Sequence, residues 1–119
     1  MARVRLIHWK SDEAVELVRS LAGSDHTVDH EPLDPDALKN LKANPPDAIV
    51  IDLSRSPARG RDLWLLLRKA RSTRCVPLVF VGGESEKVER VRELLPDAAF
   101  TTRRGASAAL ARALLRGAR

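Results

Sequence analysis

The chain has 119 residues, of which 44% are hydrophobic and 31% charged, and its formal net charge is +5. This composition is typical of globular proteins and excludes a disordered or collagen-like chain, and the length suits one domain over residues 1–119. No apolar run approaches the roughly 20 residues of a membrane-spanning helix, so we expect a cytoplasmic protein that makes no membrane contact.

The first third of the chain predicts two strands around one helix. Residues 4–8 form an aliphatic run typical of a strand, and Ser11 follows as the predicted N-cap of a helix. Residues 26–30 alternate in polarity and predict an edge strand. The apolar face of the intervening helix is predicted to consist of Val15, Val18, Leu21 and Ala22.

The middle of the chain predicts a second helix and a buried strand. Asp34 followed by proline is typical of a helix N-terminus, and this helix carries Leu38 and Leu41 on its apolar side. Residues 48–51 are continuously apolar, as expected of a strand that is covered on both faces, and Asp52 stands at its carboxyl end.

The second half repeats this alternation of helices and strands. Residues 54–60 are predicted to form a loop, before a helix with Leu63, Leu66, Leu67 and Ala70 on one face. Strands are predicted over residues 76–81 and 98–101. The helix between them has an apolar face, and an alanine-rich helix over residues 107–115 ends the series. The face of that intervening helix consists of Val88, Val91, Leu94 and Leu95.

Five strands alternating with five helices predict an α/β fold with parallel strands joined by right-handed crossovers. We expect a three-layer αβα sandwich with a flavodoxin-like five-stranded sheet in the order 2-1-3-4-5. The functional crevice of such a sheet lies at the carboxyl ends of its strands. Residues 8–10, 52–53, 82–83 and 101–104 are predicted to meet there.

This arrangement resembles the receiver domain of bacterial two-component response regulators, a phosphorelay family, across essentially the whole chain. Residues 46–53 resemble the strand that ends at the phosphoacceptor, which would be Asp52. Gly60 matches the loop glycine of the family, and residues 76–81 resemble its fourth strand. Phe100 stands at the aromatic switch position.

The sequence departs from the receiver pattern where the family carries out its chemistry. His8 and Trp9 stand where receivers have the acidic pair that binds Mg²⁺, an ion that prefers oxygen ligands. Gly82 replaces the switch hydroxyl, and Arg103 replaces a lysine with a planar guanidinium group. We therefore interpret the chain as a degenerate pseudo-receiver that has no catalytic activity, metal or cofactor.

Asp52 has two interpretations. It is a residual phosphoacceptor, or it is an aspartate paired with a cation, for which Arg103 is the natural partner. A bidentate pair of Asp52 and Arg103 would occupy the phosphoryl pocket and predict a state independent of phosphorylation. His8 is expected to serve a structural or hydrogen-bonding role, because no second metal ligand stands at a suitable spacing.

The predicted function is a non-catalytic signalling module that acts through a protein partner or a homodimer. The resemblance implies that pairing would use the outer side of the last helix together with Val88, Val91 and Phe100. Trp64 and Leu65 lie off the predicted core face of their helix and form a second candidate interface. A genuine receiver phosphorylated at Asp52 is the first alternative.

The second alternative is a nucleic-acid-associated adaptor. Residues 54–75 carry a net charge of +6 and residues 101–119 carry +5, whereas the other segments are acidic overall. If these two basic segments lie together they form one positive face, and otherwise they are ordinary solvated surfaces. The single cysteine, Cys75, excludes an internal disulfide and is expected to be buried and inert.

Overall fold

The computed structural model describes residues 2–22, 26–30, 34–54, 57–82, 86–95 and 98–117. Within these residues, five parallel strands form one sheet in the order β2-β1-β3-β4-β5. The strands are β1 (Ala2–Ile7), β2 (His26–His30), β3 (Ala48–Asp52), β4 (Leu78–Val81) and β5 (Ala99–Thr101). The helices are α1 (Ser11–Leu21), α2 (Pro35–Ala43), α3 (Pro57–Lys69), α4 (Glu86–Leu94) and α5 (Ala106–Gly117).

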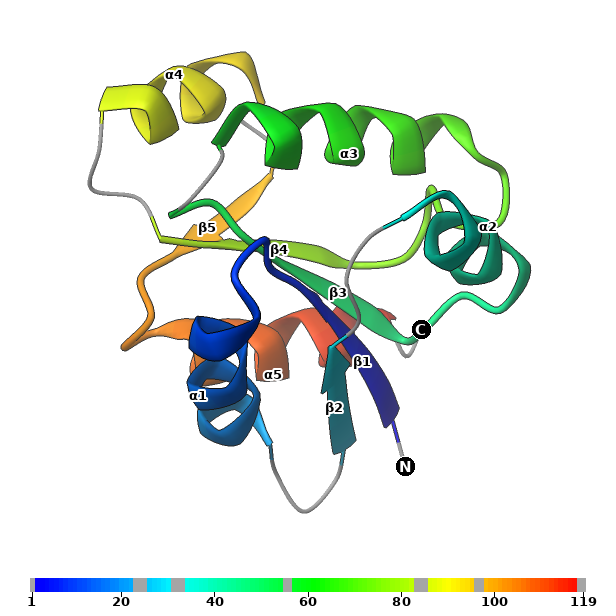
Figure 1. Ribbon diagram of the computed structural model, residues 1–119, viewed down its shortest axis with the longest axis horizontal. Coiled ribbons are helices and arrows are strands. Elements are labelled where there is room, and N and C mark those ends of the chain that lie inside the picture. The colour runs from blue at the N-terminus through cyan, green and yellow to red at the C-terminus, as the bar shows by residue number, and fades with distance from the viewer. Residues whose placement is uncertain are drawn as a thin grey trace.

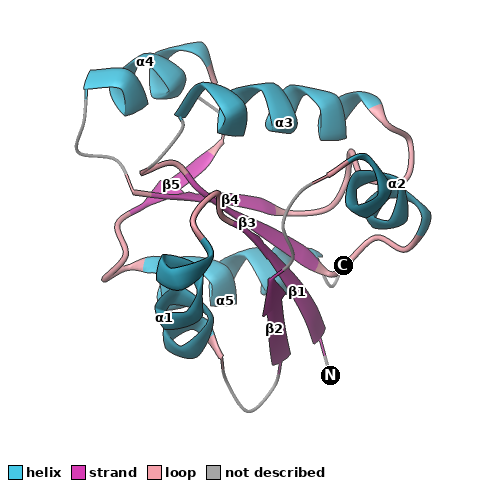
Figure 2. Ribbon diagram, viewed as in Figure 1, coloured by secondary structure: helices cyan, strands magenta, loops and turns pink. Residues whose placement is uncertain are grey.

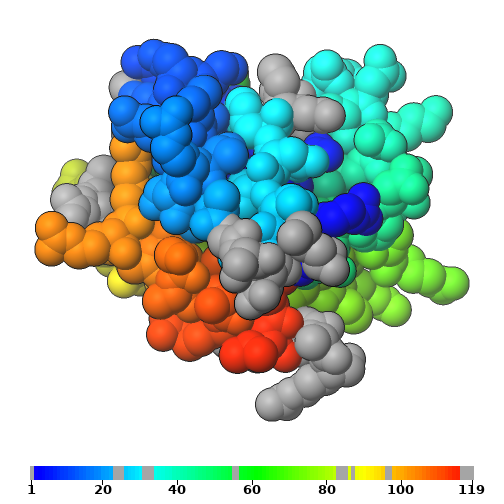
Figure 3. Space-filling model, turned by 90° about the horizontal axis from the view of Figure 1, so that it is seen from below, coloured from blue at the N-terminus to red at the C-terminus, as the bar shows by residue number. Residues whose placement is uncertain are grey.

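The sheet is the middle layer of the predicted αβα sandwich. Helices α2, α3 and α4 cover one face, and α1 and α5 cover the other (Figure 1; Figure 2). Seen from below, α1 and α5 form much of the surface (Figure 3). The flavodoxin-like fold and the strand order 2-1-3-4-5 are therefore confirmed, and the element boundaries differ from the predicted ones by one or two residues, apart from the start of α3.

The central strand β3 explains why its sequence is apolar throughout. Ala48 and Val50 pack toward α1 and α5, whereas Ile49 and Ile51 pack toward α3. Alternate residues of a strand point to opposite faces, so a strand covered on both faces buries every side chain. The last residue of the strand, Asp52, is buried as well, although it is charged in water at neutral pH.

Helix α1 is rotated by about one residue from the predicted orientation. Its buried residues are Ala14, Leu17 and Leu21, whereas Val15 is 57% exposed, so the predicted face was wrong at Val15. Ser11 is the first helical residue and not the N-cap. The cap is Lys10, whose side chain makes no capping hydrogen bond.

Helix α3 begins at Pro57, so the second half of the predicted loop is helical. Its core face also differs from the prediction, because Trp64 is buried while Leu66 is 39% exposed. The Arg68 guanidinium lies 4.3 Å above the centre of the Trp64 ring and covers it from solvent. Cys75, in the turn after α3, is exposed, which corrects the expectation of a buried thiol.

The helices of the two basic segments lie on opposite faces of the sheet. The first includes α3, and the second includes α5, on the other side of the sheet (Figure 1). Their helices are therefore separate solvated surfaces. Among the described residues, no helix is long and apolar enough to cross a membrane.

Gly60 generates a prediction about stability. A Cβ atom at this buried position would overlap the Leu53 Cδ2 methyl group and come within 3.3 Å of Ile51 Cγ2. We expect Gly60→Val to lower the free energy of unfolding by about 1–3 kcal/mol through overpacking. Urea denaturation measures this loss. Ala58→Val, on the exposed side of the same turn, is the matched control, and equal stability of the two variants would contradict the prediction.

Candidate functional site

Four chain segments meet at the carboxyl end of the sheet. Asp52 ends β3, His8 follows β1, Gly82 follows β4, and Arg103 follows β5. Pairing of β3 with its neighbours sets Asp52 beside Val81. The sheet topology therefore brings together the loops that the sequence predicted to meet.

One oxygen of Asp52 is held by the residue two positions further on. Asp52 Oδ1 accepts a hydrogen bond from the Ser54 backbone N–H at 2.8 Å, and a second one from the Ser54 hydroxyl group. Such a turn lets a short acidic side chain bond its own backbone. The two hydrogen bonds orient the carboxylate through contacts within its own chain segment, without a contribution from the neighbouring strands.

The second oxygen of Asp52 faces His8. Asp52 Oδ2 lies 3.5 Å from His8 Nε2, both side chains are fully buried, and neither atom makes a hydrogen bond within the described part of the chain. The other ring nitrogen, His8 Nδ1, accepts a hydrogen bond from the Lys10 backbone N–H at 3.0 Å. This bond requires a lone pair on Nδ1, so the neutral ring carries its proton on Nε2, the atom that faces Asp52.

Glu13 and Arg103 complete the cluster at its solvent side. Glu13 Oε2 lies 3.7 Å from His8 Nε2 and 3.6 Å from Arg103 Nη2. Arg103 Nη2 is 3.8 Å from Asp52 Oδ2 and 3.4 Å from the Ser54 hydroxyl oxygen. The hypothesis of a bidentate pair between Asp52 and Arg103 is therefore corrected, because one nitrogen of a half-exposed guanidinium group is shared among three neighbours.

Burial controls the protonation of His8. Desolvation of the charged ring lowers the pKa of His8 below its usual 6.5, while the nearby carboxylates of Asp52 and Glu13 oppose that change. The hydrogen bond from Lys10 to Nδ1 acts in the same direction as burial, because a protonated ring would place two N–H donors against each other.

Two other predicted site residues contribute backbone and packing. Gly82 adopts a φ of +92°, and its N–H donates to the Thr101 carbonyl oxygen at 3.0 Å, which ties the end of β4 to β5. Phe100 stacks at 5.0 Å from Phe80, and the Arg92 guanidinium lies 5.1 Å above its ring. The contacts of Gly82 and Phe100 described here involve no residue of the cluster around Asp52.

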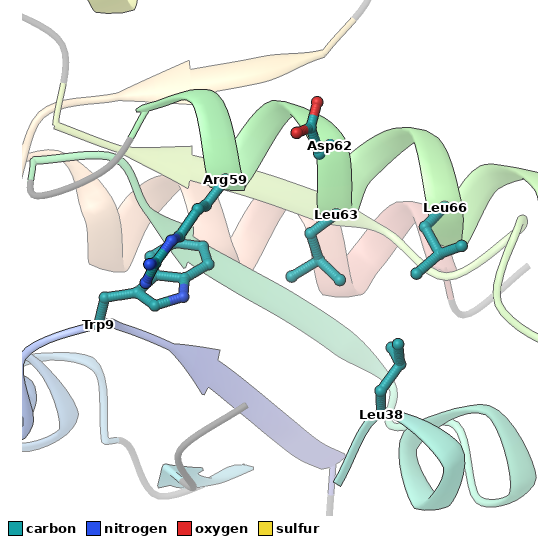
Figure 4. A pocket seen from close by; sticks show the side chains of 6 residues that line it. All are labelled: Trp9, Leu38, Arg59, Asp62, Leu63 and Leu66. Carbon is teal, nitrogen blue, oxygen red and sulfur yellow. The ribbon is translucent and has the colours of Figure 1, made fainter. Parts of the chain in front are cut away.

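Trp9 and the candidate interface residues lie elsewhere. Trp9 turns toward α2 and α3, where it lines a groove (Figure 4). Val88, Val91 and Trp64 are buried in the core, so their side chains cannot form the predicted interfaces. Leu65 is 43% exposed and remains available to a partner.

Sequence reasoning missed the roles of Glu13 and Ser54. Glu13 lies in the first turn of α1, which starts just after β1, and its carboxylate lies 3.7 Å from His8 Nε2. The contact of Ser54 with Asp52 could have been found from the sequence. Ser54 stands two residues after Asp52, and at this spacing an aspartate side chain commonly accepts a hydrogen bond from the backbone N–H.

The arrangement of strands and helices matches that of solved signalling proteins. A sensor protein from Polaromonas sp. JS666 is 22% identical, with a TM-score of 0.76 and 98% of each chain covered. A signal receiver domain of a histidine kinase from Syntrophus aciditrophicus is 21% identical, with a TM-score of 0.74 over 98% of this chain and 89% of that one. The chain has the receiver fold.

A third similar structure is a putative response regulator from Chloroflexus aurantiacus J-10-fl. It is 16% identical, with a TM-score of 0.77, and 96% of this chain and 98% of that one are covered. No protein-family model and no curated protein matches the chain. At these identities the comparison identifies the receiver fold alone, and the chemistry has to be argued from the residues.

The lowered pKa of His8 predicts a pH-dependent stability. Between the lowered pKa and 6.5, the unfolded chain binds a proton that the folded chain does not, so this contribution is fully present above about pH 6.5 and is lost as the pH falls through that window. We expect the free energy of unfolding to fall less between about pH 7.5 and about pH 5.5 in His8→Asn than in the unaltered protein. Urea denaturation at the two pH values measures this difference.

The asparagine variant preserves an oxygen that can accept the hydrogen bond from Lys10, and it removes only the titrating ring. His8→Gln provides a second neutral variant should the first fold poorly. An identical decrease in stability in the variants and in the unaltered protein would show that His8 does not carry the effect.

Proposed function

We propose that the chain is a receiver-fold signalling module that has no catalytic activity and works through contacts with protein partners, independently of phosphorylation at Asp52. The observation that carries the proposal is the buried contact of Asp52 with His8. One carboxylate oxygen is bound by Ser54, and the other faces an imidazole side chain that is also fully buried. A phosphodonor would have to displace the side chains that surround Asp52, from Arg103 on the solvent side to the buried His8, before it could reach the carboxylate.

The residues around Asp52 do not fit the Mg²⁺ ion that the receiver fold implies. Mg²⁺ requires near-octahedral oxygen ligands and binds poorly to an imidazole. Glu13 is the other carboxylate of the cluster, and it already lies between His8 and Arg103. Among the described residues, no three His, Cys, Asp or Glu side chains are arranged to hold a metal ion.

The remaining phosphoryl-binding groups of a receiver are also altered. Phosphoryl transfer depends on positioning and on neutralisation of developing charge. Gly82 offers no hydroxyl group, and the guanidinium of Arg103 is shared with Glu13 and Ser54. These contacts support a site that keeps one arrangement whether or not a phosphodonor is present.

Protein contact is favoured over nucleic-acid binding as the mode of action. The helices of the two basic segments lie on opposite faces of the sheet, so they cannot contact one phosphate backbone as a single surface. Leu65, which is 43% exposed on α3, offers apolar surface instead.

The proposal predicts a chain that does not respond to Mg²⁺ and acetyl phosphate. After incubation with both, intact-mass spectrometry should find no phosphoryl adduct, because Asp52 is inaccessible and lacks its metal. A Mg²⁺ titration followed by NMR should show no saturable shifts at the amides of His8 or Ser54. An adduct that disappears in Asp52→Asn would establish the alternative, a genuine receiver phosphorylated at Asp52.

His8→Asp is the matched control for that experiment. It places a carboxylate beside Asp52 and Glu13, so this variant is expected to gain Mg²⁺-dependent shifts that the unaltered protein lacks. A well-dispersed NMR spectrum reports that the variant is folded. Equal Mg²⁺ binding by both proteins would contradict the proposed role of His8 as a block.

A further inference from the structure

A groove lies on the α2 and α3 side of the sheet, and none of its described lining residues belongs to the Asp52 cluster. It encloses about 490 Å³ and is lined by residues of the β1–α1 loop, α2 and α3 (Figure 4). This volume falls in the range of about 300–1,000 Å³ that is typical of small-molecule sites. The lining residues are Trp9, Leu38, Arg59, Asp62, Leu63 and Leu66.

The inner surface of the groove is apolar. Leu63 and Leu66 point from α3 toward the side on which Leu38 of α2 and the indole ring of Trp9 lie (Figure 4). Leu66 is 39% exposed, although its helix has a well-covered face, so the groove leaves apolar surface in contact with water. An apolar group that fills the groove would be stabilised there because it removes that apolar surface from water.

The charges around the groove favour an anion. Arg59 points toward Trp9 and, within the described residues, makes no hydrogen bond or ion pair (Figure 4). Among the described lining residues Asp62 is the only acidic one, and it points away from Leu38 and is paired with Arg61 at 3.1 Å. The first turn of α3 also contains no acidic side chain, so the positive end of the helix dipole adds to the charge of Arg59.

We propose that this groove binds a small amphipathic anion, a planar apolar body that carries one carboxylate group. The apolar body would lie between the indole of Trp9 and the leucine side chains, and the carboxylate would pair with Arg59. The inference does not depend on the proposed function, because it involves neither Asp52 nor a protein partner.

Three naphthalene derivatives of similar size but different charge test this site. The unaltered protein is titrated with 2-naphthoate, 2-naphthylmethylammonium and 2-naphthalenemethanol and followed by NMR. We expect saturable shifts at the Trp9 indole N–H and at the Leu63 and Leu66 amides. The anion should bind about 1.5-fold to fivefold more tightly than the cation, the range that an exposed ion pair provides.

Substitutions then separate charge from apolar contact. Arg59→Gln should remove the preference for the anion. Arg90→Gln is the control, because it removes the same charge from an exposed position on α4, and it should preserve the preference. Leu66→Ser should weaken binding of all three compounds. The proposal is overturned if naphthoate causes no saturable shift at these nuclei, if anion and cation bind equally, or if the two arginine variants behave alike.

Discussion

The buried contact between His8 and Asp52 is the constraint on which the carboxyl end of the sheet depends. An aspartate at the end of a fully buried strand is costly unless its oxygens have polar neighbours. Ser54 bonds one oxygen, and the protonated nitrogen of His8 faces the other. Because these two residues surround the carboxylate, Arg103 approaches it only from the solvent side, and Glu13 mediates between the imidazole and the guanidinium groups.

The architecture could be predicted because the apolar pattern of the chain follows from the sheet itself. Strands β3 and β4 are covered on both faces, so they read as continuous aliphatic runs, and helices between them require parallel pairing. The same rule predicted which loops would meet at one edge. His8 and Arg103 were predicted at that edge, but the direct contact of His8 with Asp52 was not, because it depends on the ring orientation that the hydrogen bond from Lys10 to His8 favours.

Helix orientation was the weaker part of the prediction. In α1 the buried residues are Ala14, Leu17 and Leu21. Their spacing is as helical as that of the series through Val15, and the small alanine at position 14 is only weakly hydrophobic, so the sequence did not favour the correct face. In α3 the pattern of leucines suggested an outward Trp64, yet the tryptophan stacks on Phe80 and is covered by Arg68. A cation–π contact of this kind depends on the tertiary structure, and the hydrophobic periodicity of the sequence does not predict it.

The backbone at Gly82 limits which side chains position 82 accepts. A φ of +92° is open to glycine and strained for other residues, most of all for a β-branched threonine. A substitution that introduced a hydroxyl group at position 82 would therefore also have to change the backbone at the end of β4. Placing serine or threonine there would be a change of local conformation and not an exchange of side chains alone.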